Sequence, residues 1–157
     1  MRYVRQVMII LVLGVMFGFL FNQFSSSGIS LTGNNPVTDV QAEAVRANVP
    51  TIALDQAFQY FSEGSVVFVD ARPPELFREG RIEGAFNIPE YSVDRHLPEF
   101  RRMIPPEVPV VVYCDGQDCV ASLKVANSLA DAGYQNVQVF YGGWYEWMNA
   151  GFPIEWD

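Results

Sequence analysis

The sequence predicts an α/β domain over residues 51–157, with a mainly parallel central sheet flanked by helices in three layers. Three observations predict it. Short β-branched runs alternate with helical stripes, turn residues separate these segments, and the run PVVVYC contains no polar alternation. A strand that is apolar on both faces is typical of a parallel sheet covered by helices on both sides.

The N-terminal part, residues 1–24, predicts a membrane-targeting segment. Val7 to Phe21 is an unbroken apolar run of 15 residues that follows Arg2 and Arg5. A positive start followed by such a run fits an uncleaved signal anchor or a cleaved signal peptide. We favour the anchor, because no cleavage site of the A-x-A type follows the run. The domain is then expected on the extracytoplasmic side of a membrane, periplasmic or extracellular, with secretion after cleavage as the alternative.

Residues 25–50 are rich in Ser, Gly, Asn and Thr and predict a flexible linker. Beyond Phe21 the chain has eight basic and eighteen acidic residues, a formal charge of −10. Such a charge argues against nucleic acid or an anionic membrane surface as a partner. Two cysteines in the whole chain exclude a scaffold built on several disulfides.

The elements of the domain follow from hydrophobic periodicity and turn residues. Helices are expected over residues 54–61, 73–80, 92–104, 121–133 and 142–151. Strands are expected over residues 66–70, 84–89, 109–114 and 136–140. Sites in parallel sheets form at the carboxyl ends of strands, and this is where the sequence places Cys114.

Both cysteines lie in the loop that follows the PVVVYC strand, Cys114 at the strand's end and Cys119 five residues later. A thiol there faces backbone N–H groups and the positive end of the next helix, which together stabilise a thiolate. We therefore expect Cys114 to be a nucleophile, with a buried, inert cysteine as the alternative. Gly116 is expected to let the backbone turn its amides inward. The expected anion cradle consists of Asp115, Gly116, Gln117, Asp118 and Cys119.

Three motifs together resemble a rhodanese-like domain over about Thr51 to Trp156: VVFVDARPPELFREGRIEGAFNIP, VVVYC with its Gly-containing loop, and GGWYEWMNAGFPI. The resemblance implies a sulfurtransferase whose cysteine takes sulfur from a donor such as thiosulfate, carries it as a persulfide, and passes it to a thiol acceptor. By position, Cys114 is that catalytic residue. Asp70 and Arg72 match the family's Asp-x-Arg and imply a structural charge pair that supports the loop.

The loop departs from the family pattern in its charges. Active members usually carry an arginine just after the cysteine and another near the loop's end, whereas this chain has Asp115, then Asp118 and Cys119. The acidic loop repels dianionic thiosulfate, so a persulfide or polysulfide donor, or a protein thiol partner, is favoured. No arginine lies between Cys114 and Lys124, which argues against a phosphatase.

Cys119 is a candidate resolving thiol, because it can attack a persulfide or sulfenate on Cys114 and close a disulfide. A small residue at the start of the next helix is the alternative interpretation. Two rival functions remain open: a non-catalytic interaction module at the membrane, and a dithiol oxidoreductase that uses Cys114 and Cys119.

Other polar and aromatic residues are assigned structural roles. His96 is the only histidine, and the two cysteines are not spaced as a metal-binding set, so no metal site is implied. No cofactor is expected. Arg81 stands where the family often has histidine and is expected to be a solvated surface side chain. Trp144 and Trp147 are expected in the core.

Overall fold

The computed structural model describes Tyr3, residues 5–8, Met16, and residues 49–116 and 119–157. The chain divides into two units, residues 1–34 and 35–157, and the second contains the sheet. None of the helices within the described residues has the length and apolar character that a bilayer crossing requires. Most of the expected targeting segment, residues 1–24, and almost all of the expected linker lie outside the described residues.

The central sheet has five strands in the order β1-β6-β5-β2-β4, and every neighbouring pair is parallel. Its strands are β1 (Thr51–Ile52), β2 (Val67–Asp70), β4 (Phe86–Asn87), β5 (Val110–Tyr113) and β6 (Val137–Phe140). A separate antiparallel pair joins β3 (Arg81–Ile82) to β7 (Ile154–Glu155). The expected parallel sheet is confirmed, whereas β1 and the β3–β7 pair were not predicted.

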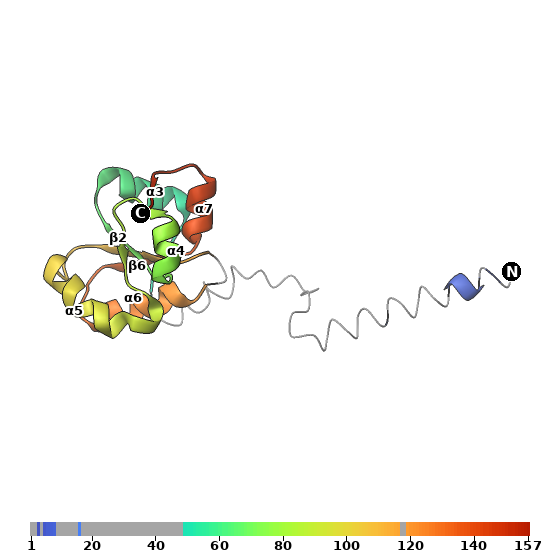
Figure 1. Cartoon of the computed structure of the whole chain (residues 1–157), viewed down its shortest axis with the longest axis horizontal. Coiled ribbons are helices and arrows are strands. Elements are labelled where there is room, and N and C mark those ends of the chain that lie inside the picture. The colour runs from blue at the N-terminus through green and yellow to red at the C-terminus, as the bar shows by residue number, and fades with distance from the viewer. Residues whose placement is uncertain (1–2, 4, 9–15, 17–48, 117–118) are drawn as a thin grey trace. The chain divides into compact units, whose positions relative to one another are not determined.

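Helices cover both faces of the sheet, which makes the fold three-layered. They are α3 (Leu54–Glu63), α4 (Pro74–Glu79), α5 (Val93–Met103), α6 (Ala121–Asp131) and α7 (Gly143–Asn149), with a short 3-10 helix η1 (Glu90–Ser92). Figure 1 shows α3 and α7 on one side of the sheet and α5 and α6 on the other. All five helices expected from periodicity are present, with bounds that differ by a few residues.

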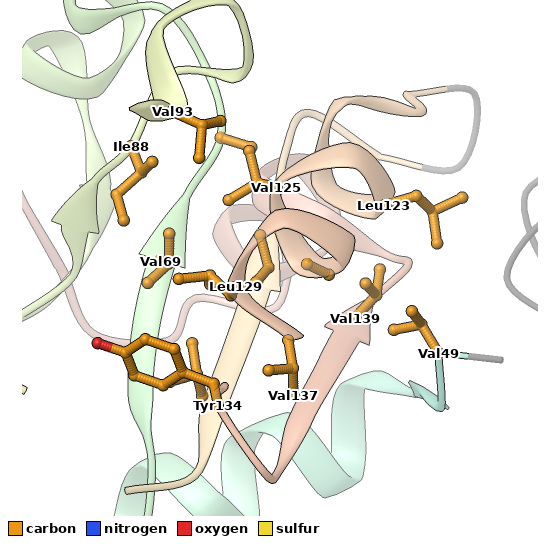
Figure 2. Close-up of a cluster of buried hydrophobic side chains, with 14 of the residues drawn as sticks. Val49, Val69, Ile88, Val93, Leu123, Val125, Leu129, Tyr134, Val137 and Val139 are labelled. Carbon is orange, nitrogen blue, oxygen red and sulfur yellow. The ribbon is translucent and has the colours of Figure 1, made fainter. Parts of the chain in front are cut away.

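Strand β5 is the middle strand of the sheet, and all four of its residues are buried, as its uninterrupted β-branched sequence predicts. Side chains alternate along it, so Val110 and Val112 face α6 while Val111 and Tyr113 face α3 and α7. Figure 2 shows the cluster on the α6 side. There, valines of the strands pack against α6 side chains such as Leu129.

Trp147 anchors the opposite face. It is fully buried, and Phe58, Phe61, Phe68 and Phe140 surround its ring at centroid distances of 5.3 to 6.2 Å. Its indole N–H donates to the Pro153 carbonyl at 2.9 Å, which satisfies the one polar group that burial would otherwise leave unpaired. The expected core positions of Trp147 and of its neighbour Trp144 are confirmed.

Candidate functional site

Cys114 lies directly after β5, at the carboxyl edge of the sheet, and only 2% of its surface is exposed. The alternation that points Val110 and Val112 toward α6 continues to Cys114, which belongs to the same buried cluster. The strand therefore aims the sulfur at the N-terminal turn of α6. This is the position expected from the sequence.

Cys119 lies beside Cys114, and the two form a disulfide with a Cα–Cα distance of 6.3 Å. The Cys119 N–H donates to the Gly116 carbonyl at 3.0 Å, which returns the chain toward the end of β5. The Cys119 carbonyl oxygen lies 3.0 Å from Cys114 Sγ. The structure thus brings together the two thiols that the sequence separates by five positions.

Ser122 is a site residue that the sequence analysis did not identify. It lies in the first turn of α6, is buried, and places its hydroxyl oxygen 3.4 Å from Cys114 Sγ. From there the hydroxyl can donate to the sulfur. The available signal was its spacing of three and seven residues from Val125 and Leu129, which puts all three on the buried face of α6.

Asp70 and Arg72 form a buried ion pair beneath the loop. Arg72 donates from Nε to Asp70 Oδ1 at 3.0 Å and from Nη2 to Oδ2 at 2.6 Å, and Nη2 also reaches the Gly80 carbonyl at 2.6 Å. The guanidinium stacks over the Trp144 ring at 4.8 Å. Burial alone would lower the pKa of Arg72, but the hydrogen bonds and negative charge of Asp70 raise it. The two side chains therefore form a buried ion pair that is hydrogen-bonded through both carboxylate oxygens.

The same guanidinium reaches the loop, because Arg72 Nη1 lies 3.9 Å from Asp115 Oδ1. The Asp115 side chain is 38% exposed. Partial burial raises its pKa, with a further contribution from the charge of Asp70, while Arg72 opposes both. One cation thus serves two carboxylates. The loop from Cys114 to Ser122 contains no basic residue of its own.

We expect Asp115→Asn to stabilise the disulfide-bonded protein at neutral pH by at most about 1 kcal/mol, because water screens this half-exposed group. The sign follows from the raised pKa: the folded state binds the proton more tightly than the unfolded chain. Stability from Asp115 is therefore present below its ordinary pKa and lost as the pH rises through its folded pKa. Urea unfolding between pH 3 and 7 measures the difference, and an equal gain at both ends of this range would contradict the charge explanation.

Helix α7 holds the main chain of the cysteine loop. The N–H groups of Trp144 and Tyr145 donate to the carbonyls of Cys114 and Asp115, at 2.8 and 3.0 Å. Gly143 makes this approach possible: its φ is 62°, and a Cβ there would lie 2.5 Å from the Cys114 carbonyl oxygen. The required glycine at the site is therefore Gly143.

Gly116, which was expected to let the backbone turn its amides inward, lies outside the left-handed region. A Cβ on Gly116 would meet only the Gly142 carbonyl, at 3.4 Å. Of the expected anion cradle, Gln117 and Asp118 lie outside the described residues. Among described atoms, the polar neighbours of Cys114 Sγ are the Cys119 carbonyl and the Ser122 hydroxyl, so the backbone cradle stays a prediction.

Arg81 is not the solvated surface side chain expected from the sequence. Its side chain is 12% exposed and binds Glu155 at 2.7 Å and Asp157 at 2.9 Å, so it fixes β7 to β3. His96 contacts the Ser92 carbonyl within α5's first turn, at 2.9 Å. In the part of the chain that the structure describes, no three His, Cys, Asp or Glu side chains are grouped to hold a metal ion.

Comparison with known proteins places this geometry in a family. A family model described as "Rhodanese-like domain" matches residues 54–150. The thiosulfate sulfurtransferase GlpE of Actinobacillus succinogenes is 32% identical over 104 residues, which cover 66% of this chain and 88% of that protein. GlpE of Tolumonas auensis is 33% identical over 98 residues, covering 62% and 87%.

Solved structures agree on the fold. The BH2092 protein from Bacillus halodurans has a TM-score of 0.62 at 21% identity, covering 78% of this chain and 87% of its own. Human single-domain sulfurtransferase TSTD1 has a TM-score of 0.57 at 22% identity, covering 64% and 96%. The names of the sequence relatives agree with the expectation of a sulfurtransferase-type enzyme. The chain belongs to the rhodanese-like domain family.

Proposed function

We propose that the chain is a sulfurtransferase that carries sulfane sulfur as a persulfide on Cys114 and passes it to a thiol acceptor. The observation that carries the proposal is the position of Cys114, buried at the carboxyl end of the central strand with the Ser122 hydroxyl 3.4 Å from its sulfur. The relatives named thiosulfate sulfurtransferase support the reaction class.

The reaction starts from the reduced site, in which both cysteines are thiols. The Cys114 thiolate attacks the sulfane sulfur of the donor, the donor's sulfur–sulfur bond breaks, and the donor leaves with that electron pair. An acceptor thiolate then attacks the outer sulfur and releases Cys114 as a thiolate. The hydroxyl of Ser122 stabilises the anionic sulfur at both stages, because a hydrogen bond to a charged acceptor is stronger than one to a neutral acceptor.

The charge of the loop favours a persulfide or polysulfide donor over thiosulfate. Asp115 follows Cys114 directly, and the nearby Arg72 already forms a buried ion pair with Asp70. At about 4 Å and an effective dielectric constant near 20, each contact between like charges costs up to about 4 kcal/mol. A dianionic donor meets this repulsion more strongly than a monoanionic one.

Cys114→Ser is expected to abolish sulfur loading. We would load the reduced full-length Cys119→Ser protein with thiosulfate, or with a small organic persulfide, and record its intact mass. The expected result is a gain of one sulfur atom, greater with the persulfide, and no gain when Cys114 is also replaced by serine. The absence of a gain with both donors, in a folded protein, would favour a non-catalytic interaction module instead.

The disulfide favours a second candidate, dithiol–disulfide exchange by Cys114 and Cys119. This reaction needs both thiols and no sulfur donor. Intact mass separates the two functions. An exchange protein, with both cysteines present, oxidises a dithiol substrate stoichiometrically, and its Cys119→Ser variant acquires no sulfur from either donor.

The N-terminal segment supports a proposal about location. Arg2 and Arg5 followed by the apolar run Val7 to Phe21 favour an anchor that keeps the domain on the extracytoplasmic side. Protease added to cells with a permeabilised outer envelope should then cleave the domain; protection until the cells are lysed would place it in the cytoplasm.

A further inference from the structure

We propose that Cys119 reduces the sulfur carried by Cys114: it attacks the Cys114 persulfide, closes the Cys114–Cys119 disulfide, and releases the sulfane sulfur as hydrosulfide. The proposal rests on the proposed function, because it requires a persulfide on Cys114. It adds an activity to sulfur transfer, since the acceptor is a thiol of the chain itself and the product is sulfide.

The geometry identifies which sulfur Cys119 reaches. In a Cys114 persulfide, Sγ is the inner sulfur and the carried atom is the outer one. Attack on the outer sulfur would only move the persulfide to Cys119, whereas attack on the inner sulfur expels the outer one. In the structure the Cys119 sulfur is bonded to Cys114 Sγ, with a Cα–Cα distance of 6.3 Å. The inner sulfur is therefore within its reach.

Both ends of the loop are anchored by contacts other than the disulfide. Cys114 ends the buried strand β5, and its carbonyl accepts a hydrogen bond from Trp144. Cys119 packs against the core two residues before α6, and its N–H is bonded to the Gly116 carbonyl. These contacts hold the second thiol near the first, which is what a fast intramolecular attack requires.

The charges near Cys114 favour release of the product. The segment from Cys114 to Ser122 has no basic residue, and Arg72 is shared between Asp70 and Asp115. No cation in this segment is therefore available to retain a persulfide or sulfide anion. In a site of this charge, departure of an anion relieves repulsion with Asp115.

The step balances in atoms and electrons. The Cys114 persulfide anion and the Cys119 thiol give the disulfide and hydrosulfide, and the proton of Cys119 passes through water to the departing sulfur. The sulfane sulfur gains two electrons, one from each cysteine sulfur as these are oxidised to the disulfide. A dithiol reductant, as a chemical class, then exchanges with the disulfide and restores both thiols. The net reaction converts sulfane sulfur and a dithiol into sulfide and a disulfide.

A single-turnover experiment tests the proposal. Reduced full-length protein, freed of reductant, receives a limiting amount of glutathione persulfide, and both the sulfide released and the intact protein mass are measured. We expect the unaltered protein to release about one sulfide per persulfide consumed and to lose two hydrogens. We expect Cys119→Ser to keep the added sulfur and to release at least tenfold less sulfide. Cys114→Ser should neither gain sulfur nor release sulfide.

Equal sulfide release by Cys119→Ser and the unaltered protein would overturn the proposal, as would a stable persulfide on the unaltered protein. If Cys119→Ser gains sulfur while the unaltered protein forms no disulfide, only this inference fails. If Cys119→Ser gains no sulfur, the proposed function fails with it. Cys119→Ala, checked by circular dichroism, provides a second variant in case serine disturbs the folding of the loop.

Discussion

Replacing Arg72 with methionine is expected to lower the free energy of unfolding by about 3–5 kcal/mol, because it leaves the Asp70 carboxylate buried without its partner. The two side chains are 2% and 0% exposed, and the guanidinium binds both carboxylate oxygens. Methionine restores much of the volume but neither the charge nor the hydrogen bond to the Gly80 carbonyl. Chemical unfolding of the disulfide-bonded protein measures the loss.

Arg78→Met is the matched control for this substitution. Arg78 is exposed, and its contact with Glu75 is a surface pair at 3.9 Å, so the expected change is within about 0.5 kcal/mol. The double variant Asp70→Asn with Arg72→Met should lose less than Arg72→Met alone, because no buried charge remains. Equal losses for Arg72→Met and Arg78→Met would show that the buried pair does not support the fold.

Gly143→Ala is expected to destabilise the protein by about 2–4 kcal/mol and to slow sulfur loading on Cys114 by about tenfold or more. Two causes add. The left-handed conformation, with φ at 62°, disfavours any residue with a Cβ, and the new Cβ would lie 2.5 Å from the Cys114 carbonyl oxygen and 2.7 Å from the Gly116 nitrogen. Both neighbours are main-chain atoms of the cysteine loop, so the loop itself must shift.

Gly64→Ala separates these causes, because Gly64 has almost the same φ, 60°, and no atom within 4 Å of the added Cβ. It should show only the conformational cost, about 1–2 kcal/mol, and normal sulfur loading. Thermal unfolding and the rate of mass gain measure both variants. The displacement of the loop would be refuted if the two alanine variants loaded sulfur at the same rate.

The sequence predicted the elements whose periodicity extends over several turns or pleats. Strand β5 was clear because its β-branched run is apolar on both faces, and α5 and α6 were clear from their apolar stripes. The two-residue strands β3 and β7 were missed, because so few residues carry no periodicity. Their pairing joins Arg81 to Glu155 across 74 positions, and only the folded chain shows it.

The site was predictable to the extent that it lies along one segment. Cys114 was found because a strand ends there, and Cys119 because it is a second thiol nearby. The contributions of Ser122 and Gly143 arise from the approach of other elements, and the sequence alone gives no distance between them and Cys114. For the same reason the sequence left the disulfide open.

The hydrogen bonds from α7 to the loop are made to carbonyl oxygens and not to side chains. The path of the chain from Cys114 to Gly116 is thereby largely independent of which side chain occupies position 115, whose carboxylate points partly to water. The loop can accordingly accept changes of charge at this position without being rebuilt. If the proposed function holds, we expect a single substitution at position 115 to change the preferred sulfur donor while the main chain of the loop stays in place.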